Sequence, residues 1–154
     1  KLVEFGRFAD RHAKKHGRNR PDTLYFLGFT LYCTRNLKGN FKMGFRTEKT
    51  RLRRSIINLS ELMSRVRHLP VKEQAINLNR VLRGHYAYYG IAGNFRALVK
   101  VYRNVVRYWR KMLGSRNREG RVTWPVFLKI LSQYPLQRPK LALPYPSLQA
   151  IAVL

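Results

Sequence analysis

Three successive stretches of the chain repeat apolar residues at the spacing of an amphipathic helix. The three sets are Leu52, Ile56, Leu59, Met63 and Val66; Ala75, Leu78, Leu82, His85 and Tyr89; and Leu98, Tyr102, Val105, Trp109 and Met112. Steps of three and four residues place each set on one face of a helix. Pro70 separates the first two stretches, and proline interrupts or starts helices. The sequence therefore predicts three helices, running from about Thr47 to Gly114, that pack as a small bundle.

The chain before this bundle has the pattern of a β-hairpin. Residues 24–32 are rich in aromatic residues and are bounded by turn residues, which predicts a strand. Residues 36–40 form a turn, and residues 41–45 return as the partner strand. We expect residues 2–9 to form a strand or short turn, and the polar residues 10–22 to form an exposed loop.

After the bundle, Thr123 and Pro125 suggest the start of a fourth, short helix that ends near Tyr134. Four of the seven prolines follow, at positions 135, 139, 144 and 146, which predicts an extended tail. The expected fold class is mainly α. We expect three segments: a hairpin segment (1–46), a helical domain (47–118) and a short basic C-terminal region (119–154).

The net charge of the chain restricts the kinds of molecule that it can bind. The chain has 32 Lys and Arg against 7 Asp and Glu, a net charge of +25, which favours a polyanionic partner. The longest apolar run, residues 24–33, is too short to span a membrane, and we see no signal peptide. The single cysteine, Cys33, excludes an internal disulfide and fits a reducing compartment. We expect a cytoplasmic nucleic-acid-binding protein, with association with the nucleoid as an alternative.

The third predicted helix has the sharpest charge pattern. Its cations, at steps of four and three residues, are Arg96, Lys100, Arg103, Arg107 and Arg110. They form one basic stripe about 20 Å long, and the sequence has no carboxylate between Glu73 and Glu119. Like charges at this spacing destabilise a helix unless a partner supplies the opposite charge. A merely solvated surface is the alternative interpretation.

Two further clusters are candidate contacts for nucleic acid. The first lies where the hairpin meets the bundle and comprises Arg46, Lys49, Arg51, Arg53 and Arg54. The second lies near the end of the second helix and comprises Arg80, Arg83, His85 and Tyr86. Arginine and aromatic planes stack on the bases of RNA. The alternative for His85 and Tyr86 is a place in the core, because both lie on or near the apolar stripe.

The sequence offers no catalytic constellation. The carboxylates are scattered without an Asp-x-Asp pattern that would hold magnesium. His12 and His16 could share a helix face, but they have no acidic or cysteine partner in the surrounding sequence. We therefore predict a binding protein that is not an enzyme and that needs no metal and no cofactor.

Several motifs resemble a known family in order along the chain. Residues 2–9 and the Phe26-Leu27-Gly28-Phe29 motif resemble the last palm segments of group II intron reverse transcriptases. Residues 83–90 (Arg-Gly-His-Tyr-Ala-Tyr-Tyr-Gly) and 93–96 (Gly-Asn-Phe-Arg) resemble the thumb of the same family, its maturase-specific domain X. Thr123-Trp124 and Pro144-Tyr145-Pro146 are similar to the ends of bacterial members.

The resemblance implies a helical thumb that grips the template–primer duplex and binds intron RNA during splicing. Its partners would be structured intron RNA, an RNA–DNA or DNA duplex, and the missing fingers and palm. The family's catalytic Ala-Asp-Asp motif would precede Lys1, so we expect a fragment or truncated copy of a longer protein. An unrelated basic RNA-binding accessory protein and a split-polymerase fragment, active only with a separate palm, are the alternatives.

Overall fold

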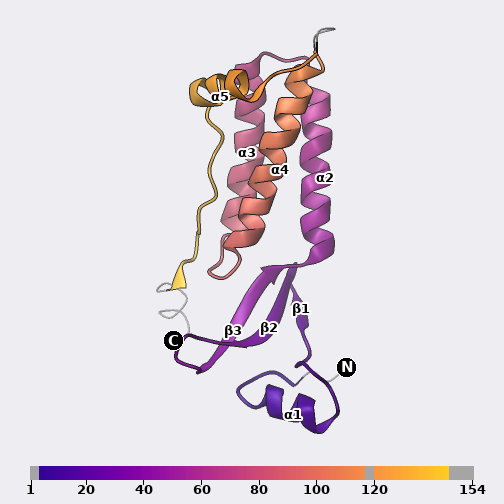
Figure 1. Cartoon of the computed structure of the whole chain (residues 1–154), viewed down its shortest axis with the longest axis vertical. Helices are drawn as coiled ribbons and strands as arrows, with labels where there is room; N and C mark the ends of the chain where they lie inside the picture. Colours follow the sequence, from indigo (N-terminus) through magenta and orange to yellow (C-terminus); the bar gives the residue numbers. More distant parts are fainter. Residues whose placement is uncertain (1–3, 117–119, 146–154) are drawn as a thin grey trace. The chain divides into compact units, whose positions relative to one another are not determined.

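The computed structural model describes residues 4–116 and 120–145 (Figure 1). The chain divides into two compact units, Lys1–Arg51 and Leu52–Leu154. The described residues form five helices and one three-stranded antiparallel sheet, a mixed α/β chain. The expected helical bundle is present, but the description of the whole chain as mainly α is too narrow, because a three-stranded antiparallel sheet lies in the first unit.

The first unit contains a small sheet preceded by a short helix. Its elements are α1 (Ala9–Lys15), β1 (Leu24–Phe26), β2 (Phe29–Arg35) and β3 (Phe41–Thr47). The predicted hairpin is confirmed, since β2 and β3 pair in antiparallel register from Phe29↔Thr47 to Arg35↔Phe41. In its turn, the Asn36 side-chain oxygen accepts hydrogen bonds from the backbone N–H groups of Lys38 and Asn40. Asparagine favours turns because its side chain can bond the backbone in this way.

Two expectations for the first unit are wrong. Residues 10–22 are not wholly a loop, because α1 occupies their first part and buries Ala9 and Ala13, four residues apart, on one face. Residues 24–32 are not one strand, because a two-residue turn separates β1 from β2. Leu27 and Gly28 both have positive φ, at 47° and 76°, which matches the twist of a tight hairpin. Leucine rarely adopts this conformation, so the residue at position 27 does not signal the turn.

The second unit is a bundle of long helices with a short helix across one end. The long helices α2 (Lys49–Val66), α3 (Val71–Tyr89) and α4 (Phe95–Gly114) lie side by side, and α5 (Trp124–Gln133) is the short one (Figure 1). All four were predicted. Pro70 directly precedes α3. Asn94 directly precedes α4, but its side chain makes no capping hydrogen bond; its Nδ2 instead donates to the carbonyl of Tyr89, at 2.8 Å.

The core of the bundle contains most of the predicted apolar stripes. Side chains with almost no exposure come from α2 (Met63), α3 (Leu78 and Leu82) and α4 (Leu98 and Trp109). Burying one large apolar side chain contributes roughly 1.5–3 kcal/mol, so the interhelical core dominates the stability of this unit. Phe127 of α5 is also fully buried and meets the Trp109 ring edge-to-face, with 5.6 Å between centroids.

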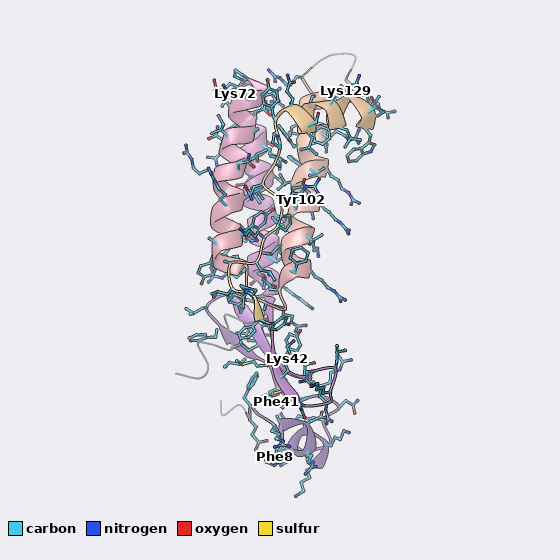
Figure 2. All side chains as sticks on the ribbon, turned by 90° about the vertical axis from the view of Figure 1, so that its left-hand side faces the viewer. Phe8, Phe41, Lys42, Lys72, Tyr102 and Lys129 are labelled. Carbon is cyan, nitrogen blue, oxygen red and sulfur yellow. The ribbon has the colours of Figure 1, made fainter. Side chains whose placement is uncertain are left out.

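An extended segment follows α5 and closes the bundle. We call residues 135–143 the strap. Figure 2 shows the strap running down the side of the bundle where α3 and α4 neighbour each other, past Tyr102. Asn79 of α3 holds its start, donating to the carbonyl of Pro135 at 2.9 Å and accepting from the Gln137 N–H at 2.6 Å. Gly90 holds its end, since its carbonyl accepts from the N–H groups of Ala142 and Leu143. The predicted extended tail also included Pro146, which lies outside the described residues.

Candidate nucleic-acid interface

The basic stripe of α4 lies on the face opposite the core. Arg96, Lys100, Arg103 and Arg107 are all exposed, whereas Leu98, Val101, Val105 and Trp109 on the other face are buried. The four cations, which we call the α4 stripe, form no ion pair with any described residue. No described carboxylate therefore neutralises these charges.

The sequence around the α4 stripe keeps this surface positive. Within the described part of the second unit the only carboxylates are Glu61 and Glu73, on α2 and in the first turn of α3. None is present in α4, α5 or the strap. Repulsion between cations three and four residues apart costs a few tenths of a kcal/mol per pair. The helix tolerates this because its buried face contributes several kcal/mol.

Arg110, the fifth predicted member of the stripe, has a different environment. Its guanidinium lies over the Trp124 ring, 4.5 Å from the centroid, and its Nη1 donates to the Val122 carbonyl at 2.7 Å. The side chain is half-buried, and its Nε has no hydrogen-bond partner. Arg110 therefore fastens the start of α5 to α4. Its assignment to the stripe does not fit these contacts.

The predicted cluster at the hairpin–helix junction is divided between the two units. Arg46 lies on β3 in the first unit, exposed, with its guanidinium 5.5 Å from the centre of the Tyr32 ring. The other four cations lie in the first turns of α2 and are all exposed. Lys49 and Arg51 still belong to the first unit, and Arg53 and Arg54 belong to the second. Arg51 Nε is 4.0 Å from the carboxylate of Glu48, an exposed pair of small energetic weight.

The α3 candidates separate into exposed and buried residues. Arg80 and Arg83 are exposed, as expected for phosphate contacts. Tyr86 is only 4% exposed, so its ring belongs to the core and is not a surface on which bases can stack. His85 is half-buried beside the Tyr89 ring, at 4.8 Å between centroids. For His85 and Tyr86, the alternative interpretation, a place in the core, therefore fits the structure better than a contact with nucleic acid.

Burial changes the protonation of both residues. Burial lowers the pKa of His85 below its ordinary value of 6.5, because removing water disfavours the charged imidazolium. Burial, and secondarily the nearby Tyr102, raises the pKa of the Tyr86 hydroxyl. Neither the Nε2 of His85 nor the hydroxyl of Tyr86 has a hydrogen-bond partner in the described structure. Both groups are therefore neutral at pH 7.

One exposed aromatic residue on the same helix belongs to the 83–90 motif but is not among the predicted contacts for nucleic acid. Tyr88 is 53% exposed, and its ring meets the Tyr89 ring edge-to-face at 4.7 Å. This residue lies one position before the last member of the predicted apolar stripe. Because Tyr88 is not a member of the predicted apolar stripe of this helix, the sequence already indicated that its ring faces solvent.

The described residues offer little for metal or membrane chemistry. They contain no group of three or more His, Cys, Asp or Glu side chains that could hold a metal ion. The expectation that His12 lacks an acidic neighbour is wrong, since its Nδ1 lies 3.1 Å from the Glu4 carboxylate in an exposed pair. No described helix is both long and apolar enough to cross a bilayer.

Comparisons with models of known protein families, with curated proteins and with solved structures find no match to this chain.

Proposed function

We propose that the second unit binds nucleic acid through the α4 stripe. The observation that supports this is four exposed cations on one helical face, without an ion pair to any described residue and without a carboxylate on the helix. From Arg96 to Arg107 the helix rises about 16 Å. A duplex carries one negative charge per ~1.7 Å of its axis, so this length faces several phosphates at once.

Phosphate contacts of this kind give affinity with little sequence preference. Additional exposed cations lie on α3 (Arg80 and Arg83) and in the first turns of α2 (Arg53 and Arg54), and they enlarge the positive surface of the unit. Tyr88 adds one exposed ring that could stack on an unpaired base. We therefore propose structured RNA and RNA–DNA or DNA duplexes as ligands.

Within this class, we propose that the chain acts as the thumb and maturase region of a group II intron reverse transcriptase. The support is the order of its motifs, above all residues 83–90 and 93–96. In this role it would hold intron RNA for splicing and the template–primer duplex for reverse transcription. An unrelated RNA-binding accessory protein would share the α4 stripe but would show no preference for intron RNA. A split-polymerase fragment would support DNA synthesis when mixed with a separate palm.

The test compares two double charge reversals that change net charge equally. Arg103→Glu/Arg107→Glu removes the centre of the α4 stripe, and Lys72→Glu/Lys129→Glu changes exposed lysines elsewhere on the same unit. Anisotropy across a salt series, with a structured RNA and a duplex, should show steep salt dependence for the unmodified protein. Loss of two phosphate contacts should reduce the log–log slope on the duplex by about 2.

The stripe variant should also bind at least about tenfold more weakly, while the lysine variant should lose much less affinity. Equal weakening by both variants would mean that only net charge matters, which contradicts the proposed interface. Comparing an intron RNA with an unrelated structured RNA of equal length then separates the maturase role from a general RNA-binding role.

A further inference from the structure

The strap leaves a pocket against α3 that the α4 stripe does not explain. It measures about 330 Å³ and is lined by Arg83, Tyr86 and Ala87 from α3, and by Gln137, Lys140, Leu141 and Ala142 from the strap. This volume falls at the lower end of the range for small-molecule sites. The helix supplies one wall and the strap the other, so the pocket exists only while the strap lies against α3.

The two walls place complementary chemical groups around this pocket. Arg83 and Lys140 are exposed cations on opposite walls, and neither pairs with a described carboxylate. Ala87, Leu141 and Ala142 provide apolar surface between them. Because α3 beyond Glu73 and the whole strap lack carboxylates, an anionic ligand meets no repulsion here.

Tyr86 lines the pocket, and its side chain has a buried polar group that forms no hydrogen bond with a described residue. The residue is 4% exposed, yet its hydroxyl has no hydrogen-bond partner in the described structure. A buried hydroxyl without a partner is costly, and native structures rarely keep one without a reason. The raised pKa keeps this hydroxyl protonated, so it can donate to a ligand oxygen or ring nitrogen, or accept from a ligand N–H.

We infer that the pocket between α3 and the strap holds one unstacked nucleotide of a bound RNA. The base would enter between the two walls and meet the Tyr86 hydroxyl, and its phosphates would lie against Arg83 and Lys140. This inference rests on the proposed RNA binding and adds to it a preference for RNA with an unpaired nucleotide. A simple inorganic anion would use the two cations but not the apolar walls.

The experiment uses two RNA duplexes that differ by one unpaired adenosine, and reads the ratio of their affinities. The pocket contacts the unpaired base, which the plain duplex lacks, so the unmodified protein should bind the bulged duplex about tenfold more tightly. Tyr86→Phe removes only the hydroxyl, and Arg83→Gln/Lys140→Gln removes the cations of the pocket. Both variants should reduce the ratio towards one. The matched variant Arg80→Gln/Lys129→Gln, outside the pocket, should weaken both complexes alike and keep the ratio.

The outcomes separate this inference from the proposed function. A ratio near one for the unmodified protein, or an unchanged ratio in both pocket variants, would overturn the nucleotide site while leaving duplex binding by the α4 stripe intact. Failure to bind either RNA would overturn the proposed function and this inference with it. Equal unfolding temperatures for the unmodified protein and Tyr86→Phe would show that a changed ratio reflects the site and not the fold.

Discussion

Trp109 of α4 donates its indole N–H to the side-chain oxygen of Gln74 in α3, at 2.9 Å, in the interior of the bundle. Gln74 in turn donates to the backbone carbonyls of Arg67 and Leu69, at 3.2 and 2.8 Å. One buried side chain thus joins α4, the start of α3 and the connection between α2 and α3. Both residues are essentially unexposed, so water cannot replace these bonds.

We therefore expect Gln74→Met to destabilise the bundle although it preserves volume. The substitution leaves the indole N–H and two carbonyls without partners, and each buried unsatisfied group costs about 1–3 kcal/mol. Chemical denaturation should show a loss in this range or above it. Gln133→Met, at an exposed position of α5, is the control. If both variants lose the same small amount, water reaches the buried groups and the structural role of Gln74 is wrong.

Arg110 should matter for stability more than for binding. Arg110→Ala removes the cation–π contact with Trp124 and the bond to the Val122 carbonyl, at a cost of about 1–2 kcal/mol. Arg103→Ala should leave stability nearly unchanged and weaken RNA binding more. Thermal unfolding and anisotropy on the same two proteins check this. If Arg110→Ala instead weakened RNA binding more than Arg103→Ala and cost less stability, Arg110 would belong to the α4 stripe.

Gly90 should control whether the strap stays in place. A Cβ at this position would overlap the Tyr86 carbonyl oxygen at the end of α3, and it would lie 2.8 Å from the Ala142 nitrogen and 3.0 Å from the Lys140 carbonyl oxygen of the strap. Gly90→Ala should therefore distort the end of α3 and push the strap away, at about 1–3 kcal/mol, and speed tryptic cleavage after Arg138 and Lys140.

The natural control for Gly90 is Gly84, within the same helix. A Cβ there meets nothing within 4 Å, and replacing glycine by alanine inside a helix usually stabilises it by about 0.5–1 kcal/mol. Gly84→Ala should keep the slow cleavage of the unmodified protein. Equal cleavage rates for the two variants would argue against a tight contact between Gly90 and the strap.

His85 should make the bundle sensitive to acid. Because burial lowers its pKa in the folded state, the unfolded chain binds this proton more readily once the pH falls below about 6.5. The stabilising contribution of neutral His85 is therefore present above that pH and is lost as the pH falls. Denaturation at pH 7.5 and 5.5 should show a smaller loss in His85→Gln than in the unmodified protein. The control, His68→Gln at an exposed position, should behave like the unmodified protein.

Added salt should stabilise the free protein but weaken its binding to nucleic acid. Repulsion along the α4 stripe falls as ions screen it, with a Debye length of about 10 Å at 0.1 M, so the unfolding temperature of the free protein should rise with salt. Binding should weaken over the same range. Arg103→Gln/Arg107→Gln should reduce both effects. An unfolding temperature of the free protein that does not change with salt would show that the stripe carries no repulsion.

The helices could be predicted because each has a long apolar stripe that the bundle buries. Boundaries were accurate where proline or glycine stands at the end, as at Pro70 and Gly114. The turn at Leu27 could not be predicted, because the conformation is imposed by strand pairing on a residue that disfavours it. Gln74 was also missed, because a polar residue gives no periodic signal even where it is buried.

The site was only partly predictable for similar reasons. The spacing of cations identified the exposed face of α4. Spacing alone could not show that Arg110 packs on the Trp124 ring and so does not belong to that exposed face. The strap followed from its prolines as an extended segment. Its path along α3 depends on single contacts at Asn79 and Gly90, which local sequence does not encode. The pocket therefore arises from two sets of residues that lie fifty or more positions apart, a separation that no short motif can reveal.

The position of the strap at the end of the described chain has a consequence for synthesis. On the ribosome, α2, α3 and α4 emerge before α5 and the strap, so the side of the bundle that the strap covers is exposed until the strap itself has emerged. Until then Gly90 and Asn79 lack the hydrogen-bond partners that they have in the finished fold. A nascent chain would thus display its helices to RNA before it has built the pocket, and the order of translation would set the order in which the two binding properties appear.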